Sequence, residues 1–143
     1  MTAVTQTQSL SAVIHRTFDE ALVILRSALQ AESIEIVREV PFHLAFQKSM
    51  GVSCRKYTVL VVWSQFEAWR AVLTESDTGL LMPFNIVVRE NGSSTVIAID
   101  SWTGRRSAHG TVGISMMLRD IETRIRRALE HCVHDPRSAW IET

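Results

Sequence analysis

The chain has 143 residues, of which 46% are hydrophobic and 21% are charged, as in an ordinary globular protein with one core. Fifteen basic and fifteen acidic residues give a formal net charge of zero, so no overall field favours a nucleic acid or an anionic membrane as partner. We expect no secretory signal, and no apolar run approaches the ~20 residues of a membrane span. The two cysteines, Cys54 and Cys132, lie far apart, which disfavours a disulfide scaffold and indicates a cytoplasmic protein.

The first part of the chain predicts a tail, a strand and a helix. Residues 1–9 are small and polar, which is typical of a flexible tail. Apolar and polar residues alternate over 10–16, which predicts a first strand. Thr17, followed three residues later by Glu20, forms a capping box, and apolar residues at helical spacing then predict a helix over 18–31.

A strand, a short helix and another strand follow. We expect the strand at 34–40, ended by Pro41, because proline cannot continue a sheet ladder. The short helix is predicted at 43–50, where Gly51 suits the left-handed position just past a helix end. Nearly every residue over 57–63 is apolar, which is typical of a strand covered on both faces.

A second capping box, Ser64 with Glu67, opens the next predicted helix, which ends near Leu73. Phe66, Trp69 and Leu73 recur at helical spacing on this helix. We therefore expect these three large side chains to point inward and to join the core.

A hairpin and a long helix complete the pattern. Strands at 84–89 and 95–101 are joined through Asn91-Gly92, the favoured pair for a tight hairpin turn. The segment 103–113, with its glycines and arginines, predicts a loop. A helix with one apolar stripe follows and is stopped by Asp135-Pro136.

The resulting order is β-α-β-(α)-β-α-β-β-α, without an internal repeat or a linker. We therefore expect one α+β domain over 10–135 and a C-terminal tail over 136–143. A hairpin is antiparallel, and long amphipathic helices need a sheet face to cover. The sequence predicts a curved antiparallel sheet of about five strands with the helices of 18–31 and 113–132 on one face.

The apolar strand over 57–63 also bears on self-association. Side chains on its two faces alternate, with Tyr57, Val59, Val61 and Trp63 on one face and Thr58, Leu60 and Val62 on the other. Two long helices cover only one face of the sheet, so the other face is left open. We expect the open face to pack against a second copy, unless the short helices at 43–50 and 65–73 cover it.

Four segments of the chain carry a family resemblance. They are Phe18-Asp19-Glu20-Ala21, Leu25 to Val40, Tyr57 to Leu73, and Asp77 to Pro83 followed by the hairpin. In this order they resemble the "domain of unknown function 302" family, over Val13 to about Leu129. The resemblance implies a fold like that of the TATA-binding protein, with a β-α-β4-α core, in a small stand-alone bacterial or archaeal protein that is often dimeric. It implies no established activity, and a shared fold is no argument for DNA binding.

Three positions depart from the family pattern. Many relatives have Cys-Asn-Pro where this chain has Trp63-Ser64-Gln65, and many have a cysteine where Phe84 stands. Ser33 replaces the glycine that often ends the first helix. The absence of both cysteines argues against thiol or metal chemistry at that place in this chain.

The cluster of His131, Cys132 and His134 is the most metal-like feature of the sequence. The two histidines could share a helix face, and a thiolate would add a soft ligand. However, Cys132 continues the apolar stripe of the last helix, and histidines at a helix C-terminus are stabilised by the helix dipole. We therefore expect no metal and no cofactor, and keep these residues as a weak candidate.

The segment from Gly104 to Gly110 is the best candidate for binding an anion. Arg105, Arg106 and His109 precede a helix start, where guanidinium groups and free amides could hold a phosphate or a carboxylate. Its spacing matches no phosphate-binding loop, and a solvated surface loop is the plainer alternative, which we favour. As candidate ligand-binding residues we take Arg105, Arg106, His109, Trp63 and Ser64.

No motif assigns a catalytic activity to the chain. Our leading hypothesis is a non-enzymatic module that binds a small ligand or a partner and acts as a homodimer. The alternative is an enzyme acting on a small anionic substrate through the 103–113 loop, with Arg105 and Arg106 as the clamp and His109 as the acid or base. A pocket that contains several of His15, His43, His109 and a carboxylate would favour the enzyme, and a wide apolar groove would favour the binding module.

Overall fold

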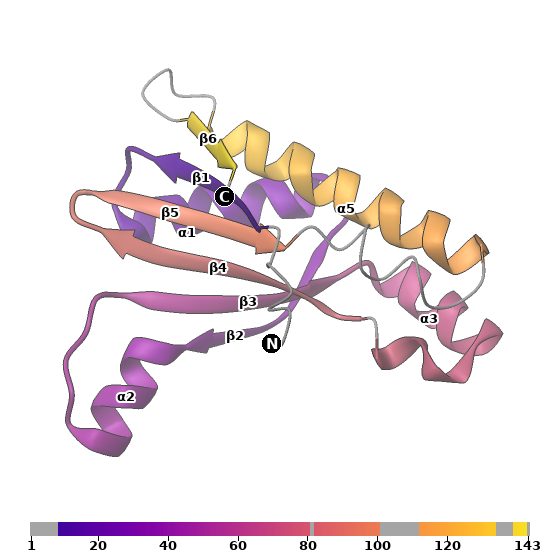
Figure 1. The fold of residues 1–143 in the computed structure, drawn as a ribbon, viewed down its shortest axis with the longest axis horizontal. Coiled ribbons are helices and arrows are strands. Elements are labelled where there is room, and N and C mark those ends of the chain that lie inside the picture. The colour runs from indigo at the N-terminus through magenta and orange to yellow at the C-terminus, as the bar shows by residue number, and fades with distance from the viewer. Residues whose placement is uncertain (1–8, 81, 101–111, 134–138, 143) are drawn as a thin grey trace, which may run out of the picture.

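The computed structural model describes residues 9–80, 82–100, 112–133 and 139–142 (Figure 1). In chain order its elements are β1 (Ser9–Ile14), α1 (Phe18–Ala31), β2 (Glu35–Pro41), α2 (Phe42–Met50), β3 (Tyr57–Trp63), α3 (Gln65–Thr74), the 3₁₀ helix η1 (Ser76–Leu80), β4 (Phe84–Asn91), β5 (Ser94–Asp100), α5 (Val112–Cys132) and β6 (Ala139–Glu142). The predicted elements are therefore present, with ends that differ by one or two residues. Across these ranges no helix is long and apolar enough to cross a membrane.

The strands form one antiparallel sheet in the order β2-β3-β4-β5-β1-β6. The first five are the strands expected from the sequence. The sixth, β6, pairs with β1 and lies within the segment predicted to be a C-terminal tail. In the sheet, β1 therefore lies between β5 of the hairpin and β6.

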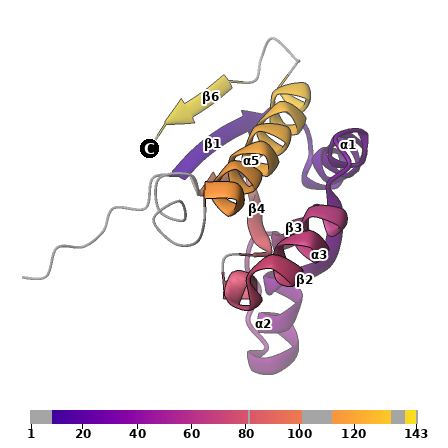
Figure 2. The ribbon, with the colours of Figure 1, turned by 90° about the vertical axis from the view of Figure 1, so that its right-hand side faces the viewer.

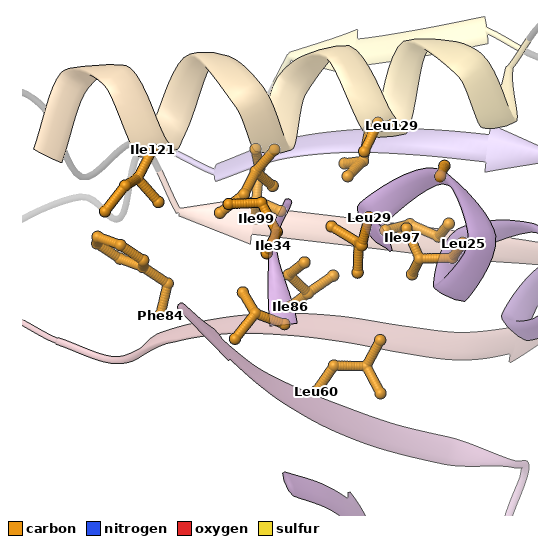
Figure 3. Close-up of a cluster of buried hydrophobic side chains, with 14 of the residues drawn as sticks. Leu25, Leu29, Ile34, Leu60, Phe84, Ile86, Ile97, Ile99, Ile121 and Leu129 are labelled. Carbon is orange, nitrogen blue, oxygen red and sulfur yellow. The ribbon is translucent and has the colours of Figure 1, made fainter. Parts of the chain in front are cut away.

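The two long helices cover the same face of the sheet, as predicted (Figure 2). One contiguous core joins them to the sheet, and Figure 3 shows side chains of α1 and α5 directed toward those of β3, β4 and β5. Labelled in that view are Leu25 and Leu29 of α1, Ile121 and Leu129 of α5, and Leu60, Ile86 and Ile97 of the sheet. The fold class is therefore α+β with an antiparallel sheet and the long helices on one side.

Local signals set both ends of α1. At its start the Thr17 hydroxyl accepts a hydrogen bond from the Glu20 amide and donates one to the Glu20 carboxylate. At its end Ser33 adopts the left-handed conformation, with φ = 57°. The Ser33 amide donates to the carbonyl of Gln30, and the Ile34 amide donates to that of Leu29, which is the Schellman arrangement. A serine thus fills the place that usually favours glycine.

The hairpin between β4 and β5 is present, but its turn lies one residue later than predicted. Asn91 pairs with Ser94 across the ladder, so Gly92 and Ser93 are the two central residues. Gly92 has φ = 61° at the first of these positions. A type II′ turn requires a glycine with positive φ as its first central residue. Gly92 meets this requirement, so the turn is centred on Gly92 and Ser93 rather than on Asn91 and Gly92.

The orientation predicted for α3 is wrong. Phe66, Trp69 and Leu73 point outward and are 61%, 60% and 68% exposed. The residues that α3 buries are Ala68 and Ala71, and both belong to the core beneath the long helices. The narrow alanine side lets the helix backbone approach the core closely, and the large side chains are left on the outer side.

Apart from Phe42 of α2, which stacks on Tyr57 at one end, the short helices do not cover the far face of the sheet. On β3 the Thr58, Leu60 and Val62 face is buried against the long helices, whereas Tyr57, Val59, Val61 and Trp63 are half-buried. The only residues that α3 buries lie in the helix-side core, and α2 buries none. In register, Val59 sits between Val40 of β2 and Val87 of β4, so the open face has a valine-rich strip at its centre.

Candidate functional site

The structure places only part of the predicted ligand-binding set. Arg105, Arg106 and His109 lie outside the described residues, so their placement stays a prediction. Trp63 ends β3, is half-buried and packs against the edge of the core. Ser64 follows it at the start of α3 and is 3% exposed.

Ser64 does not cap α3 in the way the capping box predicts. Its hydroxyl donates a hydrogen bond to the Glu67 carboxylate rather than accepting one from a helix amide. The first amide of the helix, that of Gln65, donates instead to the Glu35 carboxylate at 3.0 Å. A carboxylate is favoured beside the positive end of the helix dipole, so Glu35 of β2 caps this end of α3 through a different amide from the one expected for Ser64.

Beyond Ser64 a shallow hollow of about 290 Å³ lies between α3 and α5. It is lined by Glu67, Arg70, Ala71, Thr74, Gly113, Ile114, Met117 and Asp120. Its two carboxylates are paired with Arg124, whose Nη1 lies 3.6 Å from Glu67 and 3.4 Å from Asp120. Arg70 places its guanidinium over the Phe66 ring at 5.6 Å.

Arg124 also holds the end of α1. Its Nε donates to the carbonyl of Glu32 and its Nη2 to that of Ser33, each at 2.9 Å. The side chain is only 13% exposed, and it joins α5 to α1 and α3. The carboxylates of Glu67 and Asp120 are therefore paired within the protein, and none of the described residues that line the hollow is a histidine.

The structure places His131 and Cys132 of the metal candidate in different surroundings. His131 is exposed on the last turn of α5, whereas Cys132 is 5% exposed and belongs to the core. Burial raises the pKa of the Cys132 thiol to about 12, so the thiol stays protonated at neutral pH. His134 lies outside the described residues. Within the ranges that the structure covers, no three His, Cys, Asp or Glu side chains are grouped to hold a metal ion.

The exposed apolar side chains of α2 and α3 are the feature that the sequence did not predict. On α2, Phe42 stacks on Tyr57 at 5.2 Å between ring centroids, and Phe46 and Met50 continue the same stripe outward. On α3 the stripe consists of Phe66, Trp69 and Leu73. The two stripes show the helical spacing of an amphipathic helix, but no described element of the chain covers them.

Comparison with known families gives a match to the model of the "Domain of unknown function DUF302" over residues 10–132. This match takes in most of the chain. The chain belongs to the DUF302 family. A solved DUF302 structure, "Crystal structure of uncharacterized conserved protein DUF302 from Bacillus stearothermophilus", superposes with a TM-score of 0.77 at 19% sequence identity. The superposition covers 89% of this chain and 99% of that one, which shows a common fold. Among curated proteins no match was found.

The positions that depart from the DUF302 pattern have structural roles in this chain. Phe84 is fully buried and lies opposite Ile121 in the core (Figure 3). The Gln65 amide donates a hydrogen bond to the Glu35 carboxylate, and a proline at this position could not donate it. These two positions therefore serve packing and capping in this DUF302 chain.

Proposed function

We propose that this chain is a non-enzymatic binding module that acts as a homodimer in the cytoplasm and takes a small ligand or a protein partner. The observation that carries the proposal is the exposed aromatic stripe of α3, with Phe66 and Trp69 each more than half exposed. An aromatic side chain has about 150–250 Å² to bury, so these two rings alone offer on the order of 200 Å² of apolar surface. Apolar patches of a few hundred Å² on a small protein usually mark contacts.

The charge of the chain supports self-association. Fifteen basic and fifteen acidic residues leave a formal net charge of zero, so two copies meet without overall electrostatic repulsion. The valine-rich open face of the sheet adds a second apolar surface for a partner. Both surfaces present apolar side chains, which fits the binding of a partner.

The internal pairing around the hollow supports the same reading. A carboxyl group that acts as a general acid or base must be able to meet the substrate. Glu67 and Asp120 instead share Arg124, and Ser64 donates to Glu67. We therefore assign the Ser64 side of α3 to ligand or partner binding rather than to catalysis.

The cytoplasmic assignment is supported by the cysteines. Cys54 is exposed, Cys132 is buried, and they are free rather than joined by a disulfide. Proteins kept in a reducing compartment retain such free thiols.

Two measurements on the full chain test the proposal. Sedimentation equilibrium at micromolar concentration should give twice the 16.1 kDa chain mass, and a monomer at every concentration would contradict the homodimer. Native mass spectrometry of protein purified from its own host should show a bound small molecule or a copurified protein. A bare chain mass with no adduct in repeated preparations would contradict the binding role.

A further inference from the structure

The helix α2 has little to stabilise it within its own chain. It has nine residues, none of them buried. Isolated helices of fewer than ~12–15 residues are marginal in water and need tertiary packing. Its contacts to the rest of the chain come from the first turn, where Phe42 stacks on Tyr57 and the His43 ring lies 6.0 Å from Phe18. In the last turn of α2, Met50 is 64% exposed, so its apolar side chain is free to pack against another surface.

The helix α3 differs from α2 because its inner side packs on the core of its own chain, whereas its apolar outer side is exposed. Phe66, Trp69 and Leu73 form that outer side, together with Val72. This surface is suited to receive an apolar helix, because ridges of one helix pack into grooves of another.

The two helices lie at opposite ends of β2 (Figure 1). Glu35, the first residue of β2, accepts the first amide of α3. Pro41, the last residue of β2, is the N-cap of α2. A strand of seven residues at about 3.3 Å per residue separates them by roughly 20 Å, so α2 cannot cover α3 of its own chain.

We propose that two copies associate across their β2 edges, with α2 of one copy packed on α3 of the other. A two-fold axis across this edge reverses the strand direction in the second copy. It therefore brings α2 of each copy to α3 of its partner and forms the same contact twice. This inference rests on the proposed homodimer and names its interface.

The contact is made by the helices rather than by direct pairing of the two β2 strands. The ladder of β2 has a bulge between Ile36 and Arg38, and its exposed residues include Glu35, Arg38 and Glu39. Bulges and charges on an edge strand oppose the addition of another strand. The helices offer apolar side chains to such a contact, and Arg70 beside the α3 stripe places its guanidinium over the Phe66 ring.

The exposed apolar area fits a second copy. Seven large apolar side chains with 40–68% exposure lie on or next to the two helices: Phe46, Met50, Val52, Phe66, Trp69, Val72 and Leu73. They offer on the order of 600 Å² per protomer, which approaches the ~800 Å² per partner of a standard interface.

A pair of charge variants tests the contact. Met50→Glu on α2 and Leu73→Lys on α3 should each weaken the dimer about tenfold or more, because in a symmetric dimer each substitution buries a charge in both contacts. Mixing the two variants should restore association as a heterodimer, since one contact then pairs Glu with Lys and the other is native. Val23→Glu on α1, at a similarly exposed position, is the matched control and should leave the dimer intact.

The outcomes separate this inference from the homodimer itself. A monomeric native chain would refute both. A native dimer that survives both charge variants, with circular dichroism showing native folds, would refute the α2–α3 contact and leave the homodimer. In that case the open sheet face would be the interface, and Val59→Arg on this face should break the dimer. Two monomeric variants that fail to associate when mixed would also refute the reciprocal contact.

Discussion

The Arg124 guanidinium donates a 2.9 Å hydrogen bond to the main-chain carbonyl of Ser33, just past the end of α1. Carbonyls at a helix C-terminus lack partners within the helix and carry the negative end of its dipole. Arg124 therefore satisfies a helix end and joins the C-terminal half of the chain to the N-terminal half.

Replacing Arg124 should destabilise the fold clearly. Arg124→Met removes hydrogen bonds to two carbonyls and leaves Glu67 and Asp120 without their cation. Hydrogen bonds to charged groups contribute about 1.5–3 kcal/mol, and we expect a loss of about 2–3 kcal/mol in the free energy of unfolding by urea. Arg26→Met is the matched control. It breaks an exposed ion pair with Glu39 and should cost less than about 1 kcal/mol.

Ser33→Gly should stabilise the protein. Ser33 has φ = 57°, a conformation in which a side chain is strained and glycine is not. We expect a gain of about 1 kcal/mol, since the left-handed conformation costs roughly 1–2 kcal/mol for residues with a Cβ atom. Ser27→Gly, at an exposed position inside α1, should have the opposite sign with a loss of about 0.5–1 kcal/mol. Equal urea midpoints for the two variants would show that Ser33 is not strained.

Burial of Cys132 should make the protein less stable at high pH. The folded pKa is raised from 9.0 to about 12, so the folded state favours the protonated thiol. This contribution is fully present below pH 9 and is lost as the pH rises toward 12, at up to about 1.4 kcal/mol per pH unit. Urea unfolding from pH 8 to 10.5 should show this slope in the native chain and a weaker slope in Cys132→Ala.

The same burial predicts thiol reactivity. With Ellman's reagent at pH 8, the exposed Cys54 should react in the folded chain and Cys132 only after unfolding. Fast labelling of both thiols in the native state would contradict the buried position of Cys132.

His43 should be the residue that attaches α2 to the sheet. Its Nδ1 lies 3.0 Å from both the amide and the carbonyl of Tyr57, so the ring has a partner with Nδ1 either protonated or not. His43→Ala should cost about 1 kcal/mol and should speed hydrogen exchange of the Tyr57 amide by NMR. Leu44→Ala, at the next exposed position, should leave that amide protected. Unchanged exchange in both variants would place the attachment of α2 elsewhere.

Local sequence signals predicted those parts of the fold that depend on neighbouring residues. The Thr17 and Glu20 pair marked the start of α1, and Gly51 adopts the left-handed conformation expected past α2, with φ = 66°. The turn at Gly92 was found within one residue, because turn chemistry is local. In contrast, β6 was missed, since four residues give too short a pattern and their partner β1 lies at the other end of the chain.

The candidate site was harder to predict because its contacts cross the sequence. Glu35 caps α3 from 30 residues away, and Arg124 reaches Ser33 from 91 residues away. The prediction of which side of α3 faces the core failed for another reason. Spacing identifies a stripe but does not say which stripe faces the core, and here Ala68 was preferred over Trp69 because a small side chain permits closer packing.

The position of β1 has a consequence for folding during synthesis. The first strand to leave the ribosome pairs with β5, around residues 94–100, and with β6, at 139–142. At about 5–20 residues per second, β1 waits roughly 4–16 s for its first partner strand. The meander from β2 to β5 can form meanwhile from consecutive strands, so β1 is incorporated after four strands that are synthesised later than it, and β6 follows.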